Sequence, residues 1–393
     1  MTSHTASAVA KPMPSLRDRW LARRDGWLAS PSFQDWAARF PLTRWIVRRR
    51  ARAVFDLVAG FVYSQVLFAC VKLELLELLA QGPLTLDAIA RRVGLDGEAA
   101  DRLLRAAVAL QLVQHRSGGR FGLGTLGAPI AVNASIRAMV EHHAMFYGDL
   151  ADPVALLRRE QPERSRLAGY WPYAGAADPS SVASGEVGDY SALMSASQPL
   201  VAGEILRAYP IARHRCLLDV GGGEGTFLTA AARVAPSLRL VLFDLPAVAE
   251  RARARFAAEG LGDRAVAVGG SFIADELPAG ADLATLVRVL HDHDDARVAT
   301  LLRAVHRALE PGGTLIVAEP MAETPGAERM GDAYFGFYLL AMGRGQPRTA
   351  DRLAALLGDA GFEGMRTLST LLPLQTRLLV ATKPLAKTLS AGA

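Results

Sequence analysis

The chain has 393 residues, of which 51% are hydrophobic and 21% charged, with 36 Gly and 21 Pro. This length predicts two or three domains, and the composition excludes a globally disordered, collagen-like or low-complexity protein. Residues 1–60 hold 11 of the 44 Lys and Arg residues and 4 of the 39 Asp and Glu residues. Residues 61–393 hold the other 33 basic and 35 acidic residues. Because residues 61–393 are close to neutral, most of the protein surface is unsuited to binding nucleic acid. We therefore expect no nucleic-acid partner.

The two cysteines, Cys70 and Cys216, are too few for a disulfide scaffold or a thiolate zinc site. Both lie in apolar runs, which predicts buried, inert thiols in a reducing, cytoplasmic compartment. We expect no metal site. The longest apolar run, residues 57–71, contains Ser64 and Gln65 and is shorter than the ~20 residues that a membrane-spanning helix needs.

Residues 1–52 form a basic arm that holds four of the five tryptophans, Trp20, Trp27, Trp36 and Trp45. Trp rings favour membrane interfaces, and Arg side chains are attracted to anionic headgroups. The arm could therefore touch an inner or photosynthetic membrane. It could equally pack its rings onto the body or onto a second subunit, and the sequence leaves both interpretations open.

Residues 53–130 are predicted to contain helices followed by a hairpin. Two short helices, the second over residues 98–110, precede LVQHRSGGRFGL (112–123), whose hairpin turns at Gly118-Gly119. This order is typical of a winged helix. The second helix mixes acidic with basic side chains, which suits a phosphate-lined groove poorly, so a structural or dimerisation role is favoured over DNA binding.

From about residue 199 the pattern changes to alternating strands and helices. Apolar runs such as CLLDV (216–220) and TLIVAE (314–319) predict buried strands, and amphipathic stretches between them predict helices. Residues 174–189, which precede this region, are rich in small residues, Pro and Gly and predict a linker. The alternation indicates an α/β fold with a mostly parallel sheet that is covered on both faces.

The strongest local motif is LLDVGGGEGTF (217–227), in which a buried strand ends in a glycine turn that leads into a helix. Gly221, Gly223 and Gly225 permit positive φ and let backbone N–H groups approach a ligand. The next strand ends in Asp244, and an acid at that place can accept both hydroxyls of a ribose. The sequence therefore predicts a nucleoside cofactor.

The glycine spacing narrows the choice of cofactor. No Lys-Ser/Thr pair follows the turn, which excludes a P-loop, and the dinucleotide fingerprint spaces its last glycine differently. Glu224, at the helix start, is expected to repel a diphosphate but not a sulfonium or an α-amino group. This favours S-adenosylmethionine (SAM), with S-adenosylhomocysteine as the product.

A second cluster, RVLHDHDD (288–295), places His291 directly after an apolar strand. Glu319 ends another strand, and the carboxyl ends of parallel strands meet at one edge of the sheet. We expect His291 and Glu319 to be neighbours there, with the carboxylate fixing the imidazole tautomer so that His291 acts as a general base. His293 should point away unless the loop turns.

With these motifs, residues 53–383 resemble the plant-type O-methyltransferase family. The matching segments are DVGGGEG (219–225), FDLP (243–246), GGSF (269–272), LHDH (290–293) and AEP (318–320). The resemblance implies a Rossmann-like SAM methyltransferase domain with a mostly parallel seven-stranded sheet of order 3-2-1-4-5-7-6, residues 374–382 forming an antiparallel strand. It also implies an N-terminal helical, winged dimerisation domain, and hence a homodimer.

The resemblance further implies which residues form the site. His291 and Glu319 are expected to be catalytic. Two residues depart from the family pattern, because Ser271 stands where an Asp is usual and His293 where a Trp is usual. The residues expected to bind the cofactor are Asp219, Gly221, Gly223, Gly225, Asp244, Leu245, Gly270, Ser271, Phe272 and Arg288.

Four segments follow from these patterns. The expected boundaries are 1–52 for the arm, 53–198 for the dimerisation domain with its linker, 199–386 for the methyltransferase domain and 387–393 for a tail.

More narrowly, residues 29–44 and 48–73 are similar to the carotenoid hydroxyl methyltransferases of purple phototrophic bacteria, of the demethylspheroidene or hydroxyneurosporene type. This likeness implies a tertiary alcohol on a long acyclic polyene as the substrate. A lipophilic substrate needs an apolar tunnel, although at least half of the candidate aromatic residues are expected to be ordinary core. The candidates for substrate contact are Phe146, Tyr147, Tyr334, Phe337, Tyr338 and Met342.

Three alternative functions stay open on the sequence. The first is methylation of a phenolic or polyketide hydroxyl by the same machinery. The second is a winged-helix regulator with an inactive cofactor domain, and the third is an NAD-dependent oxidoreductase.

Overall fold

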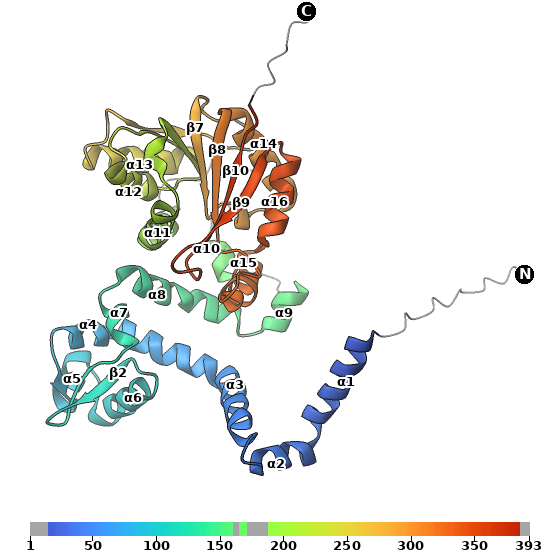
Figure 1. The fold of residues 1–393 in the computed structure, drawn as a ribbon. Helices are drawn as coiled ribbons and strands as arrows, with labels where there is room; N and C mark the ends of the chain where they lie inside the picture. Colours follow the sequence, from blue (N-terminus) through green and yellow to red (C-terminus); the bar gives the residue numbers. More distant parts are fainter. Residues whose placement is uncertain (1–14, 160–164, 171–187, 386–393) are drawn as a thin grey trace, which may run out of the picture.

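The computed structural model describes residues 15–159, 165–170 and 188–385. Figure 1 shows three parts: a projecting N-terminal arm, a small winged-helix part and a larger α/β part. All but the last two positions of the predicted linker lie outside the described residues. The domain boundaries expected from the sequence stay predictions.

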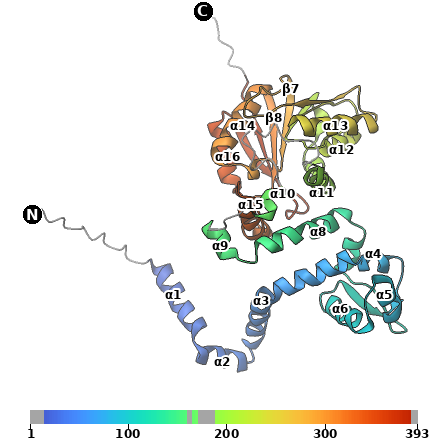
Figure 2. The same cartoon turned by 180° about the vertical axis from the view of Figure 1, so that it is seen from behind.

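The arm consists of helices α1 (Leu16–Ala29) and α2 (Pro31–Arg39) and the first half of α3 (Arg44–Lys72). Ser15 begins α1 with a capping box, in which its side chain accepts from the Asp18 N–H and Asp18 accepts from the Ser15 N–H. Within α1 and α2 only Ala37 is buried. Figures 1 and 2 show both helices projecting away from the rest of the protein.

By length and composition alone α3 could cross a membrane, and 11% of its most apolar 18-residue window is buried. This differs from the expectation based on residues 57–71, because the helix extends beyond that run on both sides. A single such helix is weak evidence for a membrane span. The expected boundary between residues 52 and 53 falls inside α3, since the basic composition ends there but the helical pattern does not.

The winged-helix part follows α3 and agrees with the sequence prediction. Its three strands pair in the order β1-β3-β2, and Gly118 and Gly119 turn the hairpin with φ of 71° and 65°. Thr85 and Asp96 cap its two short helices with their side chains. The elements are α4 (Leu75–Ala80), β1 (Leu84–Thr85), α5 (Leu86–Val93), α6 (Gly97–Ala109), β2 (Val113–Arg116), β3 (Arg120–Leu123) and α7 (Gly127–Ala131).

Helix α8 (Ala134–Asp149) joins the winged-helix part to the α/β part. It contacts α3 on one side and α11 (Gly188–Ala208) and α15 (Phe335–Met342) on the other. Figures 1 and 2 show α8 running between α3 and the α/β part. Two short helices lie in the same connection, α9 (Pro153–Arg158) and α10 (Arg166–Tyr170).

The α/β part contains a seven-stranded sheet of order β6-β5-β4-β7-β8-β10-β9. If the strands of this sheet are numbered 1 to 7 along the chain, starting at β4, the order is 3-2-1-4-5-7-6, as predicted. Strand β10 is antiparallel to both of its neighbours, which also agrees with the prediction. The strands are β4 (Cys216–Val220), β5 (Arg239–Asp244), β6 (Ala265–Gly269), β7 (Ala281–Val287), β8 (Leu309–Glu319), β9 (Glu363–Leu368) and β10 (Arg377–Thr382).

Helices cover both faces of this sheet because successive residues of a strand point to opposite sides. On β4, Leu218 packs in the core formed with α14 (Asp295–Ala308) and α16 (Ala350–Asp359), and Leu217 packs in the core formed with α11, α12 (Thr226–Val234) and α13 (Pro246–Ala258). The fold prediction is therefore confirmed. The remaining elements are η3 (Ile211–Arg213), η4 (Leu290–Asp292) and the π-helix η5 (Arg329–Tyr334).

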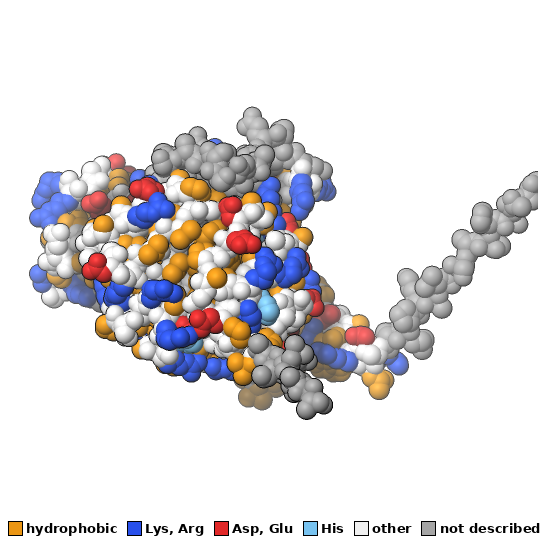
Figure 3. Space-filling model, turned by 90° about the horizontal axis from the view of Figure 1, so that it is seen from above, with side chains coloured by type: hydrophobic (Ala, Val, Ile, Leu, Met, Phe, Trp, Pro, Cys, Tyr) orange, Lys and Arg blue, Asp and Glu red, His pale blue; other side chains and the backbone are white. Residues whose placement is uncertain are grey.

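The surface charge of the α/β part and the burial of the two cysteines also agree with the sequence prediction. Figure 3 shows acidic and basic side chains interspersed around an apolar area on the upper face of the α/β part, as a near-neutral body predicts. Cys70 and Cys216 are both buried and free. Burial raises the pKa of Cys70 to about 12, which keeps this thiol unreactive.

Candidate active site

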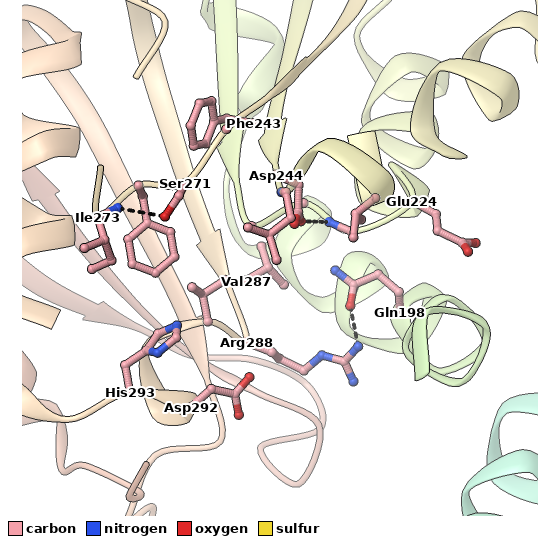
Figure 4. A pocket seen from close by; sticks show the side chains of 18 of the residues that line it. Gln198, Glu224, Phe243, Asp244, Ser271, Ile273, Val287, Arg288, Asp292 and His293 are labelled. Carbon is pink, nitrogen blue, oxygen red and sulfur yellow. Dashed lines mark hydrogen bonds between the residues drawn. The ribbon is translucent and has the colours of Figure 1, made fainter. Parts of the chain in front are cut away.

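The loops at the carboxyl ends of β4, β5, β6 and β7 line one crevice, which Figure 4 shows from close by. The edge of an open α/β sheet is the usual place for a ligand. Helix α11 closes one side of the crevice with Ser195 and Gln198. The loops contribute Gly221, Gly222, Gly223, Glu224, Asp244, Leu245, Gly270, Ser271, Phe272, Ile273, Val287, Arg288, Val289, Asp292 and His293.

The three glycines of the first turn all have positive φ but differ in what surrounds them. A Cβ on Gly221 would lie 2.7 Å from a methyl carbon of Val289, whereas a Cβ on Gly223 would meet no atom within 4 Å. Gly223 therefore leaves open room at the crevice for a ligand. Gly225 is not among the lining residues, because it begins α12 against the ring of Phe256.

Asp244, at the end of β5, holds the glycine turn and faces the crevice. Its Oδ2 accepts from the Gly223 N–H at 2.8 Å, and its Oδ1 accepts from the Leu245 N–H at 2.7 Å. Each oxygen keeps a further lone pair with which it can accept from a ribose hydroxyl. Burial raises the pKa of Asp244 to about 6, so the carboxylate is ionised at neutral pH.

Asp219 lies behind the turn and is not among the lining residues. Its Oδ1 accepts from the Thr285 hydroxyl at 2.6 Å, and its Oδ2 has no hydrogen-bond partner among the described residues. A Cβ on Gly222 would come within 2.6 Å of that Oδ2, so Asp219 supports the turn from below. Burial raises its pKa to about 7.

Glu224 lines the crevice, but its carboxylate points away from it (Figure 4). It accepts from the Ser195 hydroxyl at 2.9 Å, from Arg251 at 2.6 Å and from Arg255 at 3.0 Å. Burial raises the pKa of Glu224, yet these hydrogen bonds outweigh that effect and lower it. Two arginines thus neutralise the charge, and the prediction that Glu224 repels a diphosphate loses its basis.

The loop after β6 forms the apolar end of the crevice. The Ser271 N–H donates to Asp275 at 2.8 Å, and the Phe272 ring meets His293 edge-on with centroids 5.2 Å apart. The 3-10 turn η4 redirects the following loop, so His293 lines the crevice instead of pointing away. Burial, together with the charge of Arg297, lowers the pKa of His293 to about 4, and the ring is neutral.

Arg288 connects the end of β7 to α11. Its guanidinium donates to the Ser197 hydroxyl and to the Gln198 side-chain oxygen, both at 2.8 Å. Its backbone adopts a left-handed conformation with φ of 57°, which is uncommon for a residue other than glycine. This contact fixes one wall of the crevice.

Glu319 and His291 form a buried pair beside the crevice. The Glu319 Oε1 accepts from the N–H groups of Val289 at 2.9 Å and Leu290 at 2.7 Å, and its Oε2 pairs with the His291 Nδ1. His291 does not line the crevice itself. Its ring lies between the crevice loops and α15, where it meets Phe335 with centroids 5.8 Å apart.

Asp292 approaches the other nitrogen of His291, with its Oδ1 3.2 Å from Nε2. Burial lowers the pKa of His291, but the charges of Asp292 and Glu319 outweigh it and raise the pKa above its ordinary value. Burial also raises the pKa of Asp292 to about 6. Sequence reasoning missed Asp292, although an acid directly after a histidine at a strand end was a usable signal.

The six residues expected to contact substrate meet between α8 and the segment η5–α15. Phe146, Tyr338 and Met342 are buried and form core, whereas Tyr147, Tyr334 and Phe337 are half-buried. Within the described residues, no group of three or more His, Cys, Asp and Glu side chains is placed to hold a metal ion.

Comparisons with known proteins agree with this architecture. Residues 147–363 match an O-methyltransferase domain, and residues 55–128 match an O-methyltransferase dimerisation domain. The chain is 45% identical to demethylspheroidene O-methyltransferase of Cereibacter sphaeroides, over 90% of this chain and 93% of that protein. It is 41% identical to the enzyme of the same name from Rhodobacter capsulatus, over 87% of this chain and 85% of that protein.

Solved structures give the same result. Human N-acetylserotonin methyltransferase in complex with SAM superposes with a TM-score of 0.69 at 25% identity, over 85% of this chain and 98% of that chain.

Proposed function

Because the chain belongs to the family of O-methyltransferases that carry a separate dimerisation domain, we propose that it methylates the tertiary hydroxyl of an acyclic carotenoid. It is a SAM-dependent O-methyltransferase. The observation that carries the carotenoid substrate is the similarity, along almost the whole chain, to two demethylspheroidene O-methyltransferases. The dimerisation domain supports a homodimer.

The crevice fits SAM, which supplies a methyl group on a positively charged sulfur when bound. Asp244 would accept from the ribose hydroxyls, since both of its oxygens keep lone pairs toward the crevice. Gly223 leaves room for close backbone approach. Phe272, Ile273 and the neutral ring of His293 offer an apolar end suited to the adenine.

We infer that His291 removes the proton of the acceptor hydroxyl. Glu319, held by two backbone N–H groups, would act as a positioning residue that accepts from Nδ1 and so leaves the Nε2 lone pair for the substrate. An imidazole pKa lies far below that of an alcohol, so proton loss should accompany formation of the C–O bond. Holding the hydroxyl in line with the methyl group supplies much of the rate.

Asp292 occupies the position that this proton transfer needs. Its Oδ1 faces Nε2 across 3.2 Å, so the acceptor hydroxyl has to displace it. Asp292 also lines the crevice, which lets it pass the proton from Nε2 to solvent after methyl transfer. Its pKa of about 6 suits a group that gains and loses a proton near neutral pH.

A direct assay tests the substrate. Purified protein with labelled SAM and an extract that contains acyclic carotenoid alcohols should yield a product heavier by one methyl group, detected by mass spectrometry. A phenol and a polyketide with a free hydroxyl serve as competing acceptors, and they should remain unmethylated. Labelling of the phenol but not of the carotenoid would reject the carotenoid proposal while leaving the methyltransferase activity intact.

We further propose that the arm touches a membrane surface, while the methyltransferase fold itself is that of a soluble protein and fits a cytoplasmic location. The exposed rings are Trp20, Trp27, Trp36 and Trp45, each more than half exposed. The same helices carry the arginines of the basic arm, which are Arg17, Arg19, Arg23, Arg24, Arg39, Arg44, Arg48, Arg49, Arg50 and Arg52. Exposed Trp with Arg is the combination that favours an anionic bilayer interface.

Replacing these four tryptophans by alanine should abolish sedimentation of the protein with vesicles of anionic phospholipid. The parent should bind such vesicles and lose that binding at high salt, since part of the attraction is electrostatic. Four alanine substitutions at exposed residues of the winged-helix hairpin, His115, Arg116, Ser117 and Arg120, provide the control. If the parent stays in the supernatant at low salt, the arm serves subunit packing instead.

A further inference from the structure

A continuous row of aromatic rings leads from α3 to His291. Phe68 of α3 meets Tyr147 of α8 edge-on at 6.3 Å, and Tyr147 meets His143 at 6.2 Å between ring centroids. His143 then meets Tyr334 at 5.5 Å, and Tyr334 meets its neighbour Phe335 at 5.0 Å. Phe335 in turn contacts the His291 ring. We call Phe68, Tyr147, His143, Tyr334 and Phe335 the aromatic row.

We propose that the aromatic row is the binding wall for the chain of the polyene, along which it lies with its hydroxyl end at His291 and its far end at α3. This proposal rests on the proposed function, because it assigns the site for the carotenoid. Each ring of the row offers an apolar face that suits the flat, conjugated carbon chain of a polyene.

Exposure distinguishes the row from the core beside it. All five rings of the row are half-buried, so part of each remains open to a ligand. Phe146 and Tyr338, which are buried, both contact Tyr334 of the row. The row thus consists of partly exposed rings, and its buried neighbours Phe146 and Tyr338 form core.

The row carries no charge near neutral pH. The His143 Nε2 and the Tyr334 hydroxyl share a hydrogen bond of 2.7 Å, which satisfies both polar groups. Burial lowers the pKa of His143 and raises that of Tyr334, so both side chains stay neutral. Packing of a polyene against these two side chains therefore does not require the desolvation of a charged group.

The outer end of the row opens onto the apolar surface of α3. Leu57, Val58 and Phe61 precede Phe68 on the same helix, within the segment that matches a dimerisation domain, and in the single chain they are 76%, 66% and 73% exposed. Helix α8 carries the next two rings and contacts both α3 and α15. A lipophilic chain that lies along α3 would pass from Phe68 to the rings of α8 and from there to His291.

Chain length provides the test. Phe68→Ala and Tyr147→Ala should each raise the KM for the C40 carotenoid alcohol by roughly tenfold, the scale of losing one buried ring contact. The kcat on the carotenoid, and turnover of a ten-carbon tertiary alcohol that reaches only His291, should stay near the parent values. Tyr147→Phe, which keeps the ring, and Tyr63→Ala, five residues before Phe68 on the same helix, should behave as the parent.

Folding is checked by calorimetric binding of S-adenosylhomocysteine, which should be equal in all variants. If the parent methylates no carotenoid, the proposed function fails and this site fails with it. If the parent methylates the carotenoid but the two alanine variants leave its KM unchanged, or weaken the short and long alcohols equally, the aromatic row is not the wall and the proposed function stands. Should the short alcohol give no turnover, a lowered kcat with unchanged KM on the carotenoid overturns the proposal.

Discussion

His291→Ala is expected to lower kcat for methyl transfer by roughly 10²-fold or more, the usual contribution of a general base. The variant loses the imidazole that pairs with Glu319, so the acceptor hydroxyl would have to give its proton to water. Cofactor binding should be nearly unchanged, since His291 does not line the crevice. Single-turnover rates with labelled SAM, together with calorimetry, measure the two effects separately.

The matched control is His306→Ala, a histidine at the far end of α14. In the parent, kcat/KM should rise with pH if His291 is the base, because an imidazole can accept a proton only when it is neutral. The raised pKa of His291 means that its inactive, protonated form persists to higher pH than for an ordinary histidine. If His291→Ala keeps near-parental turnover, another group takes the proton, and Asp292 would be the next candidate.

Asp244→Ala is expected to weaken binding of S-adenosylhomocysteine by roughly 10- to 100-fold, as loss of hydrogen bonds to a charged group predicts. The carboxylate would accept from the ribose, and it also holds the Gly223 and Leu245 N–H groups. Isothermal calorimetry gives the affinity, and Asp263→Ala, at an exposed aspartate in the turn between α13 and β6, is the control.

The two roles of Asp244 can be separated with an analogue that lacks both ribose hydroxyls. If the carboxylate binds the ribose, the penalty of Asp244→Ala should largely disappear with this analogue. An equal penalty for both ligands would mean that Asp244 acts only through the glycine turn, and the ribose contact would have to be withdrawn.

The sheet could be predicted from the sequence because its strands are buried on both faces. CLLDV became β4 with all five residues buried, and its boundaries matched the apolar run. A strand covered on both sides needs apolar residues at every position, which makes it conspicuous in a sequence. Strand order came from the family resemblance, since pairing order depends on long-range packing that no local pattern records.

The site was less predictable, because the positions of side chains depend on loop geometry. The turn η4 brings Asp292 and His293 to the crevice, and it follows a left-handed conformation at Arg288. Non-glycine residues in that conformation leave no mark in composition or periodicity. The same limit applies to Glu224, whose arginine partners lie 27 and 31 residues further along the chain.

The arm and the winged-helix part are joined by α3, a single helix of 29 residues. At 1.5 Å per residue such a rod is about 43 Å long and resists bending. If α1 and α2 rest on a surface, α3 would hold the His291 imidazole at a set distance from that surface. The distance that an acceptor has to span between this surface and His291 would then help to decide which acceptors are methylated. Insertion or removal of whole turns in α3 would change that distance and, with it, the choice of acceptor.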